Sequence, residues 1–154
     1  MKILFFDDEK CFVRENLKRS LGKAELIPDS VYQDGISTTA LNTGWVFPWG
    51  DGFRLLYVGR CEDELCHLFC AESRDGIHFT PEDVTAVFEK PDAVAKNDLM
   101  NLKPGQEIAD ILEDPQADAS QRYKMLFTDL HTEEMYVYDR LLVSSDLLHW
   151  RSAM

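Results

Sequence analysis

The pattern Ser-x-Asp-x-aliphatic-His-aromatic occurs twice in this chain, as Ser73-Arg74-Asp75-Gly76-Ile77-His78-Phe79 and as Ser144-Ser145-Asp146-Leu147-Leu148-His149-Trp150. The similarity extends upstream, where Phe53-Arg54-Leu55-Leu56-Tyr57 corresponds to Tyr123-Lys124-Met125-Leu126-Phe127. Two units with the same internal order predict a repeat architecture. The alternative is a pair of unrelated hairpins that share their turn chemistry.

Each unit predicts an antiparallel meander. An apolar run is followed by a second run that ends in Ser, then by a turn and a short run ending in His and an aromatic residue. Asp75-Gly76 is a typical hairpin signal, because Gly tolerates a positive φ angle. The second copy has Leu147 in place of Gly76, so we expect its turn either to differ in type or to depend on the Asp146 side chain. A unit of about four strands has the size of one propeller blade.

The length and charge of the chain limit its organisation and its partners. With 154 residues it fits a single domain. We divide it into an N-terminal segment 1–43, a first repeat 44–80, a connection 81–107 and a second repeat 108–150. Its 16 Lys and Arg against 28 Asp and Glu give a formal net charge of −12. A field of this sign repels phosphates, so we do not expect a nucleic-acid partner.

The hydrophobic and cysteine patterns predict a cytoplasmic protein without a cofactor or a bound metal. No apolar run approaches the roughly 18 residues of a membrane helix, so no membrane partner is expected. The opening Met1–Asp8 breaks after four apolar residues, too short for a signal peptide unless an export signal was removed. The cysteine spacing is unlike that of structural zinc sites. Reduced and mostly buried thiols are therefore expected for Cys11, Cys61, Cys66 and Cys70.

Apolar patterning predicts where the strands lie. Ile3–Phe6 is expected to be a short buried strand, whereas residues 10–21 fit a helix or a strand. We expect Gly44–Pro48 to be a strand buried on both faces. The connection 81–105 is expected to hold one helical turn near Val84–Phe88. Further strands are predicted at 53–58, 65–72, 122–127 and 135–143, the last of them long or interrupted near 139–140.

An ordered series of motifs runs through most of the chain. It consists of Leu4-Phe5-Phe6-Asp7-Asp8, Phe53-Arg54-Leu55-Leu56-Tyr57, Ala71-Glu72-Ser73-x-Asp75-Gly76-Ile77, Asp114-Pro115 followed by Arg122-Tyr123-Lys124-Met125, and Ser144-x-Asp146-x-Leu148-His149-Trp150. Over roughly residues 3 to 150 this series resembles the N-terminal part of the five-bladed β-propeller glycosidase-like proteins, the superfamily related to glycoside hydrolase families 32 and 43. The resemblance implies an all-β fold of antiparallel meanders that form about two blades, a partial propeller. It also implies a carbohydrate-active protein.

The resemblance implies one catalytic candidate. The family places its sites on the inner strands, with a carboxylate base or nucleophile from the first blade, an Asp stabiliser from the second and a Glu acid from the third. Asp114 matches the second-blade Asp of an Arg-Asp-Pro motif, although Glu113 stands where the family has Arg. Glycoside hydrolysis needs two carboxylates beside the scissile bond. Asp114-Pro115 equally fits a strand-ending turn.

Other candidate residues have structural alternatives. Trp45 and Trp49 have rings that stack on sugars, and both also fit a core role. Arg122 is a candidate substrate contact or a solvated strand residue. His78 and His149 occupy the same place in both repeats, and we interpret them as structural.

Departures from the family pattern leave several functions open. The first-blade strand 44–48 carries no carboxylate, the nearest acids being Asp51, in a turn that looks peripheral, and Asp7-Asp8. No third blade supplies an acid.

We therefore expect a fragment that binds or hydrolyses glycosides if a complete site is assembled. The alternative is a non-catalytic acidic β module that acts through self-association or a protein partner, and open blade edges favour a homo-oligomer. A third hypothesis is a β-sandwich whose hairpins imitate blades.

Overall fold

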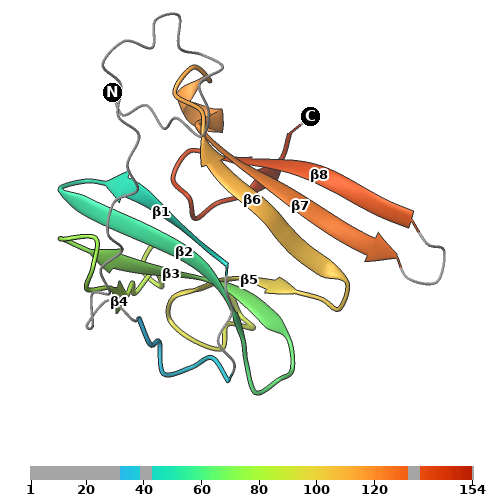
Figure 1. Ribbon diagram of the computed structural model, residues 1–154, viewed down its shortest axis with the longest axis horizontal. Coiled ribbons are helices and arrows are strands. Elements are labelled where there is room, and N and C mark those ends of the chain that lie inside the picture. Colours follow the sequence, from blue (N-terminus) through green and yellow to red (C-terminus); the bar gives the residue numbers. More distant parts are fainter. Residues whose placement is uncertain (1–31, 39–42, 132–135, 154) are drawn as a thin grey trace, which may run out of the picture.

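The computed structural model describes residues 32–38, 43–131 and 136–153, and its regular structure consists of two antiparallel sheets and one short 3-10 helix (Figure 1). The all-β prediction is therefore confirmed. The strand expected at 3–6, the ambiguous segment 10–21, Asp7-Asp8 and Cys11 lie outside the described residues. Within the described ranges, no helix is long and apolar enough to span a bilayer.

Both sheets follow the order of the chain. The first contains β1 (Gly44–Trp49), β2 (Gly52–Arg60), β3 (Cys66–Ser73) and β4 (Thr80–Pro81), with β5 (Asp98–Leu102) paired to the remainder of the β3 edge. The second contains β6 (Gln106–Glu113), β7 (Tyr123–His131), β8 (Tyr136–Ser144) and β9 (Arg151–Ser152), with the 3-10 helix η1 (Ala119–Gln121) between β6 and β7. Each sheet is thus a meander of consecutive strands, as the repeat predicts.

The structure tests four further expectations about the strands and the connection between the repeats. The connection after the first repeat contains β5, which pairs with β3 and which the sequence analysis missed. β1 is not buried on both faces, because Val46 is 51% exposed. β8 is one continuous strand of nine residues, so of the two alternatives for this segment, long or interrupted near 139–140, the long strand holds. The helical turn expected near Val84–Phe88 is present, since the Phe88 amide donates to the Val84 carbonyl at 2.8 Å.

The core lies between the two sheets. Side chains of β1, β2 and β3 pack with those of β6 and β7, and the rings of Phe47 and Tyr123 meet edge to face with centroids 5.5 Å apart. Leu56 and Met125 are completely buried in this layer. The Trp45 indole donates to Asp110 Oδ1 at 2.9 Å, so the first strands of the two sheets, β1 and β6, are neighbours (Figure 1). Burial of apolar area on both sheets stabilises this arrangement.

A buried polar network supports the other face of the first sheet. His67 on β3 is fully buried, and its two ring nitrogens lie 3.0 Å from Asp63 Oδ2 and 3.0 Å from Asp98 Oδ2. The Lys90 ammonium and the Val94 amide donate to the same Asp98 oxygen at 2.7 and 3.0 Å. Buried charges are tolerated when they are paired in this way. The network therefore fastens the connection after β4 to the first sheet.

The described cysteines, Cys61, Cys66 and Cys70, are free thiols. Burial raises the pKa of Cys61 to about 11 and the pKa of Cys70 to about 12. Because the thiolate is the reactive form, these two side chains act as small apolar groups of the fold.

One face of the second sheet remains open. Leu126 lies opposite Leu141 on neighbouring strands, and Leu130 lies opposite Val137. All four side chains are exposed, from 36% for Leu130 to 59% for Val137, and Leu112 on β6 extends the row. The hydrogen-bonded pair Thr128–Asp139 lies between the two aliphatic pairs on the same face. Exposed aliphatic groups gathered on one face are typical of surfaces that meet another molecule.

Candidate functional site

The first copy of the repeated motif forms a turn stabilised by its own side chains. The Ser73 hydroxyl accepts hydrogen bonds from the amides of Asp75 at 3.3 Å and Gly76 at 3.0 Å. Asp75 Oδ1 accepts from the amides of Ile77 at 2.9 Å and His78 at 2.8 Å, and Asp75 Oδ2 lies 2.6 Å from His78 Nδ1. Ser, Asp and His of the motif are therefore accounted for by local structure.

The second copy repeats this network. Ser144 Oγ accepts from the amides of Asp146 at 3.1 Å and Leu147 at 2.9 Å. Asp146 Oδ1 accepts from the amides of Leu148 and His149 at 2.9 Å each, and Asp146 Oδ2 lies 2.8 Å from His149 Nδ1. The positive φ of 67° at Leu147 is close to the 75° at Gly76. The two turns have the same form, so of the two alternatives expected for the second turn, the one that depends on the Asp146 side chain holds.

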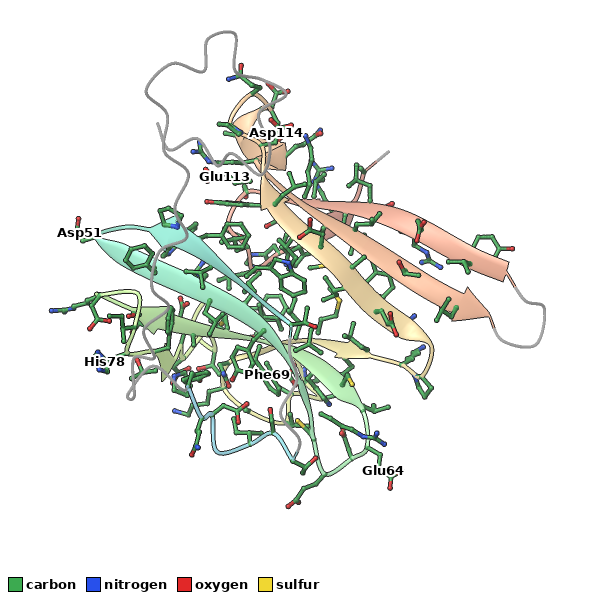
Figure 2. The ribbon with its side chains drawn as sticks, viewed as in Figure 1. Asp51, Glu64, Phe69, His78, Glu113 and Asp114 are labelled. Carbon is green, nitrogen blue, oxygen red and sulfur yellow. The ribbon has the colours of Figure 1, made fainter. Side chains whose placement is uncertain are left out.

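The first turn opens onto a cavity of about 680 Å³, which we call the Trp49 cavity. The cavity lies at the end of the first sheet where the β1–β2 turn meets the segment after β3, and Figure 2 shows Asp51 and His78 at this end. Aromatic rings and charged groups share its wall. The lining residues are Trp49, Asp51, Gly52, Phe53, Glu72, Ser73, Arg74, Asp75, His78 and Thr80.

Arg54 supports one wall of the cavity from the protein interior. Its guanidinium carbon lies 4.0 Å from the centroid of the Trp49 ring, and its side chain is only 5% exposed. Nε donates to Glu82 at 2.8 Å and Nη1 donates to the Asp146 carbonyl at 2.8 Å. A cation–π contact combined with a paired charge fixes the position of the Trp49 indole.

The charged groups of the cavity differ in whether they are already paired. The hydrogen bond from the His78 ring, together with those from the amides of the turn, holds the pKa of Asp75 well below its ordinary value. Asp75 is therefore an anion whose two oxygens already have hydrogen-bond partners in the turn. By contrast, the side chains of Asp51, Glu72 and Arg74 form no hydrogen bond or ion pair within the described ranges, and all three residues are exposed. These three side chains retain their capacity to bind a ligand.

Asp114, the catalytic candidate, lies elsewhere. It follows β6, where its Oδ1 accepts from the Gln116 amide at 3.0 Å and its Oδ2 pairs with the Lys124 ammonium. The hydrogen bond from Lys124 lowers the pKa of Asp114. It does not line the Trp49 cavity, and Figure 2 shows it with Glu113 at the end of β6, away from Asp51 and His78. Its contacts are those of a strand-ending turn with an anionic side chain.

Only one of the other candidates lines the cavity. Trp49 is a lining residue, whereas Trp45 bonds to Asp110 between the sheets. Arg122 donates to Glu113 at 2.7 Å and is thereby held on the second sheet. Asp51, expected to be peripheral, is part of the cavity wall. The run Trp49-Gly50-Asp51-Gly52, with an aromatic residue and a carboxylate in one tight turn, was the available signal for this site.

No cluster of three or more His, Cys, Asp or Glu side chains within the described part of the chain is arranged to hold a metal ion. Comparison of the chain with protein-family models, with curated proteins and with solved structures found no match. The chemistry of the site is therefore argued from its own residues.

Proposed function

We propose that this chain is a carbohydrate-binding, propeller-like β protein whose ligand occupies the Trp49 cavity. The observation that carries the proposal is the cavity wall itself, where the rings of Trp49 and Phe53 lie with the unpaired carboxylates of Asp51 and Glu72. Aromatic faces pack against the C–H groups of sugar rings, and carboxylates accept hydrogen bonds from hydroxyls. A volume of about 680 Å³ is in the usual range for a small-molecule site.

The topology supports the propeller-like part of the proposal. Strands β1–β4 and β6–β9 each form a meander of consecutive strands, β5 being added to the first sheet beside β3, and β1 and β6 adjoin through the bond from Trp45 to Asp110. Blades of a propeller are four-stranded meanders arranged around an axis. A sandwich of Greek-key type would instead carry connections that cross between sheets.

Binding fits the described residues better than hydrolysis. Hydrolysis needs one carboxyl group that keeps a proton near neutral pH and a second that is ionised. The lowered pKa of Asp114 suits a charged stabiliser and not a proton donor. A complete hydrolase would need further groups, so glycoside hydrolysis by an assembled site is the extended form of this proposal.

Calorimetric titration with neutral oligosaccharides tests binding. Trp49→Phe is expected to weaken binding about five- to tenfold, because the smaller ring covers less of the sugar. Trp45→Phe is the matched control, since Trp45 does not line the cavity. Equal affinities of the two variants, or no saccharide binding by the unmodified chain, would contradict the proposal.

Chromogenic glycosides test hydrolysis separately. If the chain turns over such a substrate, Asp114→Asn should abolish turnover while Asp118→Asn, an exposed residue of the same loop, should not. Retained turnover in Asp114→Asn would remove Asp114 from the mechanism.

A second candidate function is self-association through the open face of the second sheet. The aliphatic pairs Leu126–Leu141 and Leu130–Val137 lie on this face on either side of Thr128 and Asp139, and two copies that stack here would bury both aliphatic pairs. Light scattering over a concentration series tests it. A dimer that Leu141→Lys disrupts supports self-association, and a monomer at every concentration contradicts it.

A further inference from the structure

We propose that the Trp49 cavity selects saccharides that carry a free amine, positively charged sugars, over their neutral and acidic counterparts. This inference rests on the proposed function, because it names the class of carbohydrate that the same cavity takes. It follows from the distribution of unpaired charge in the cavity.

The unpaired anions come from two separate segments of the wall. Asp51 belongs to the β1–β2 turn, and Glu72 lies on β3, which pairs with the neighbouring strand β2. Neither carboxylate meets a cation in the described part of the chain, because the nearby Arg54 is already paired with Glu82 and with the Asp146 carbonyl. A ligand ammonium between Asp51 and Glu72 would therefore find two anions that have no protein partner.

The positive groups of the wall do not cancel these anions. The His78 ring is already bonded to Asp75. Arg74 is the remaining cation of the wall, so one positive charge stands against the two negative charges of Asp51 and Glu72. The formal charge of −12 on the whole chain adds a long-range field of the same sign. An acidic sugar would meet this field unfavourably, and a cationic sugar would be attracted.

The aromatic part of the wall also fits a cation. The Arg54 guanidinium already covers one face of the Trp49 ring at 4.0 Å, so a cation–π contact with the ligand has to come from another ring face of the wall. Phe53 supplies a second ring beside the same carboxylates. Aromatic faces and carboxylates together are the groups that recognise ammonium ligands in proteins. A sugar amine would thus combine ionic, cation–π and ring-packing contacts.

The test compares three oligosaccharides of equal length by calorimetry at about pH 6, where a sugar amine is protonated. Glucosamine, N-acetylglucosamine and galacturonic acid oligomers provide the cationic, neutral and acidic forms. The glucosamine oligomer is expected to bind about tenfold more tightly than the N-acetylated one, because each partly exposed ion pair adds up to about 1 kcal/mol. The galacturonic acid oligomer should bind most weakly.

Variants that each remove one charge show which residues cause the preference for the sugar amine. Asp51→Asn and Glu72→Gln should each weaken glucosamine binding about three- to fivefold and leave N-acetylglucosamine binding nearly unchanged. Glu62→Gln is the control, because Glu62 is an exposed carboxylate on the β2–β3 turn outside the cavity. Arg74→Gln should strengthen glucosamine binding, and added salt should reduce the preference.

The outcomes separate the two proposals. Equal or tighter binding of the neutral or acidic oligomer overturns the inference and leaves carbohydrate binding intact. The same holds if the double variant of Asp51 and Glu72 keeps the preference for the amine. No binding of any of the three oligomers overturns both the inference and the proposed function.

Discussion

The two copies of the repeated turn have the same hydrogen bonds and different surroundings. In both, the Ser hydroxyl accepts from the two following amides of the turn, and the Asp carboxylate accepts from the amides of the aliphatic residue and the His. The first turn lines the Trp49 cavity. The second turn places Leu147 and Leu148 in the core between the sheets, with exposures of 0% and 6%.

The difference shows that one local motif serves two purposes. Gly76 has no side chain to bury, and the Phe53 ring lies 3.2 Å from where a Cβ would be. Leu147 has nearly the same backbone conformation, which costs a non-Gly residue about 1–2 kcal/mol, and burial of its side chain offsets that cost. The second turn is therefore a structural contact between the sheets, and the first is available for binding.

The largest effect is expected from Arg54, which connects β2 of the first sheet to the second turn through the Asp146 carbonyl. Arg54→Met should lower the free energy of unfolding by about 3–5 kcal/mol, because Glu82 and the Asp146 carbonyl would lose their buried partner. Urea denaturation measures the change. Arg74→Met is the control and should stay within about 0.5 kcal/mol, as expected for an exposed side chain without a partner. Similar values for both variants would show that the contacts of Arg54 with Glu82 and the second turn do not stabilise the fold.

A matched pair at the aliphatic position of the motif compares the two environments directly. Leu148→Ala should cost about 2–4 kcal/mol, because its side chain is in the core. Ile77→Ala should cost about 1 kcal/mol, because Ile77 is only half-buried. Thermal unfolding of both variants checks the difference. An equal loss would mean that the two turns are packed alike.

Removal of the Ser hydroxyl tests the hydrogen-bond network that both turns share. Ser73→Ala and Ser144→Ala should each lower stability by about 1–2 kcal/mol, because each leaves two turn amides without their acceptor. Denaturation of the two variants under identical conditions provides the comparison. A difference of more than about 2 kcal/mol would show that the surroundings, and not the local network, determine the cost.

The smallest expected effect is the contribution of Asp146 to the pH dependence of stability. Burial would raise the pKa of Asp146, but the hydrogen bonds from the amide and ring of His149 and from Leu148 and Ser144 outweigh it and lower the pKa to about 2. A depressed pKa in the folded state contributes stability above the unfolded pKa of about 3.9, and this contribution is lost as pH falls through about 2. After solvent screening we expect less than about 1 kcal/mol.

Denaturation between neutral pH and about pH 2 measures this dependence. Asp146→Asn should show a shallower loss of stability in acid than the unmodified chain. Asp75→Asn should change the acid slope in the same direction, since the pKa of Asp75 is also lowered. An unchanged slope in Asp146→Asn would mean that its hydrogen bonds do not persist in solution.

The sequence predicted the strands of both repeats and the side-chain hydrogen bonding of their turns. It placed Asp114 in a catalytic or turn role, and the contacts with Gln116 and Lys124 are those of a turn. The sequence did not predict the partners of His67. Asp98 lies on β5, and the polar sequence of the connection gave no sign of a strand there. It also took Asp51 for a peripheral residue, because nothing in the turn itself shows what lies across from it.

The sequence by itself determined the elements whose interactions span a few residues. Ser73, Asp75 and His78 bond within one turn, and the same spacing at Ser144, Asp146 and His149 forms the same turn again. Only the tertiary structure decided which turn is buried and which one opens onto a cavity. The reason is that burial and cavity shape depend on side chains far apart in the sequence, such as Trp49 with Glu72 and Arg54 with Asp146, which the packing of the strands brings together.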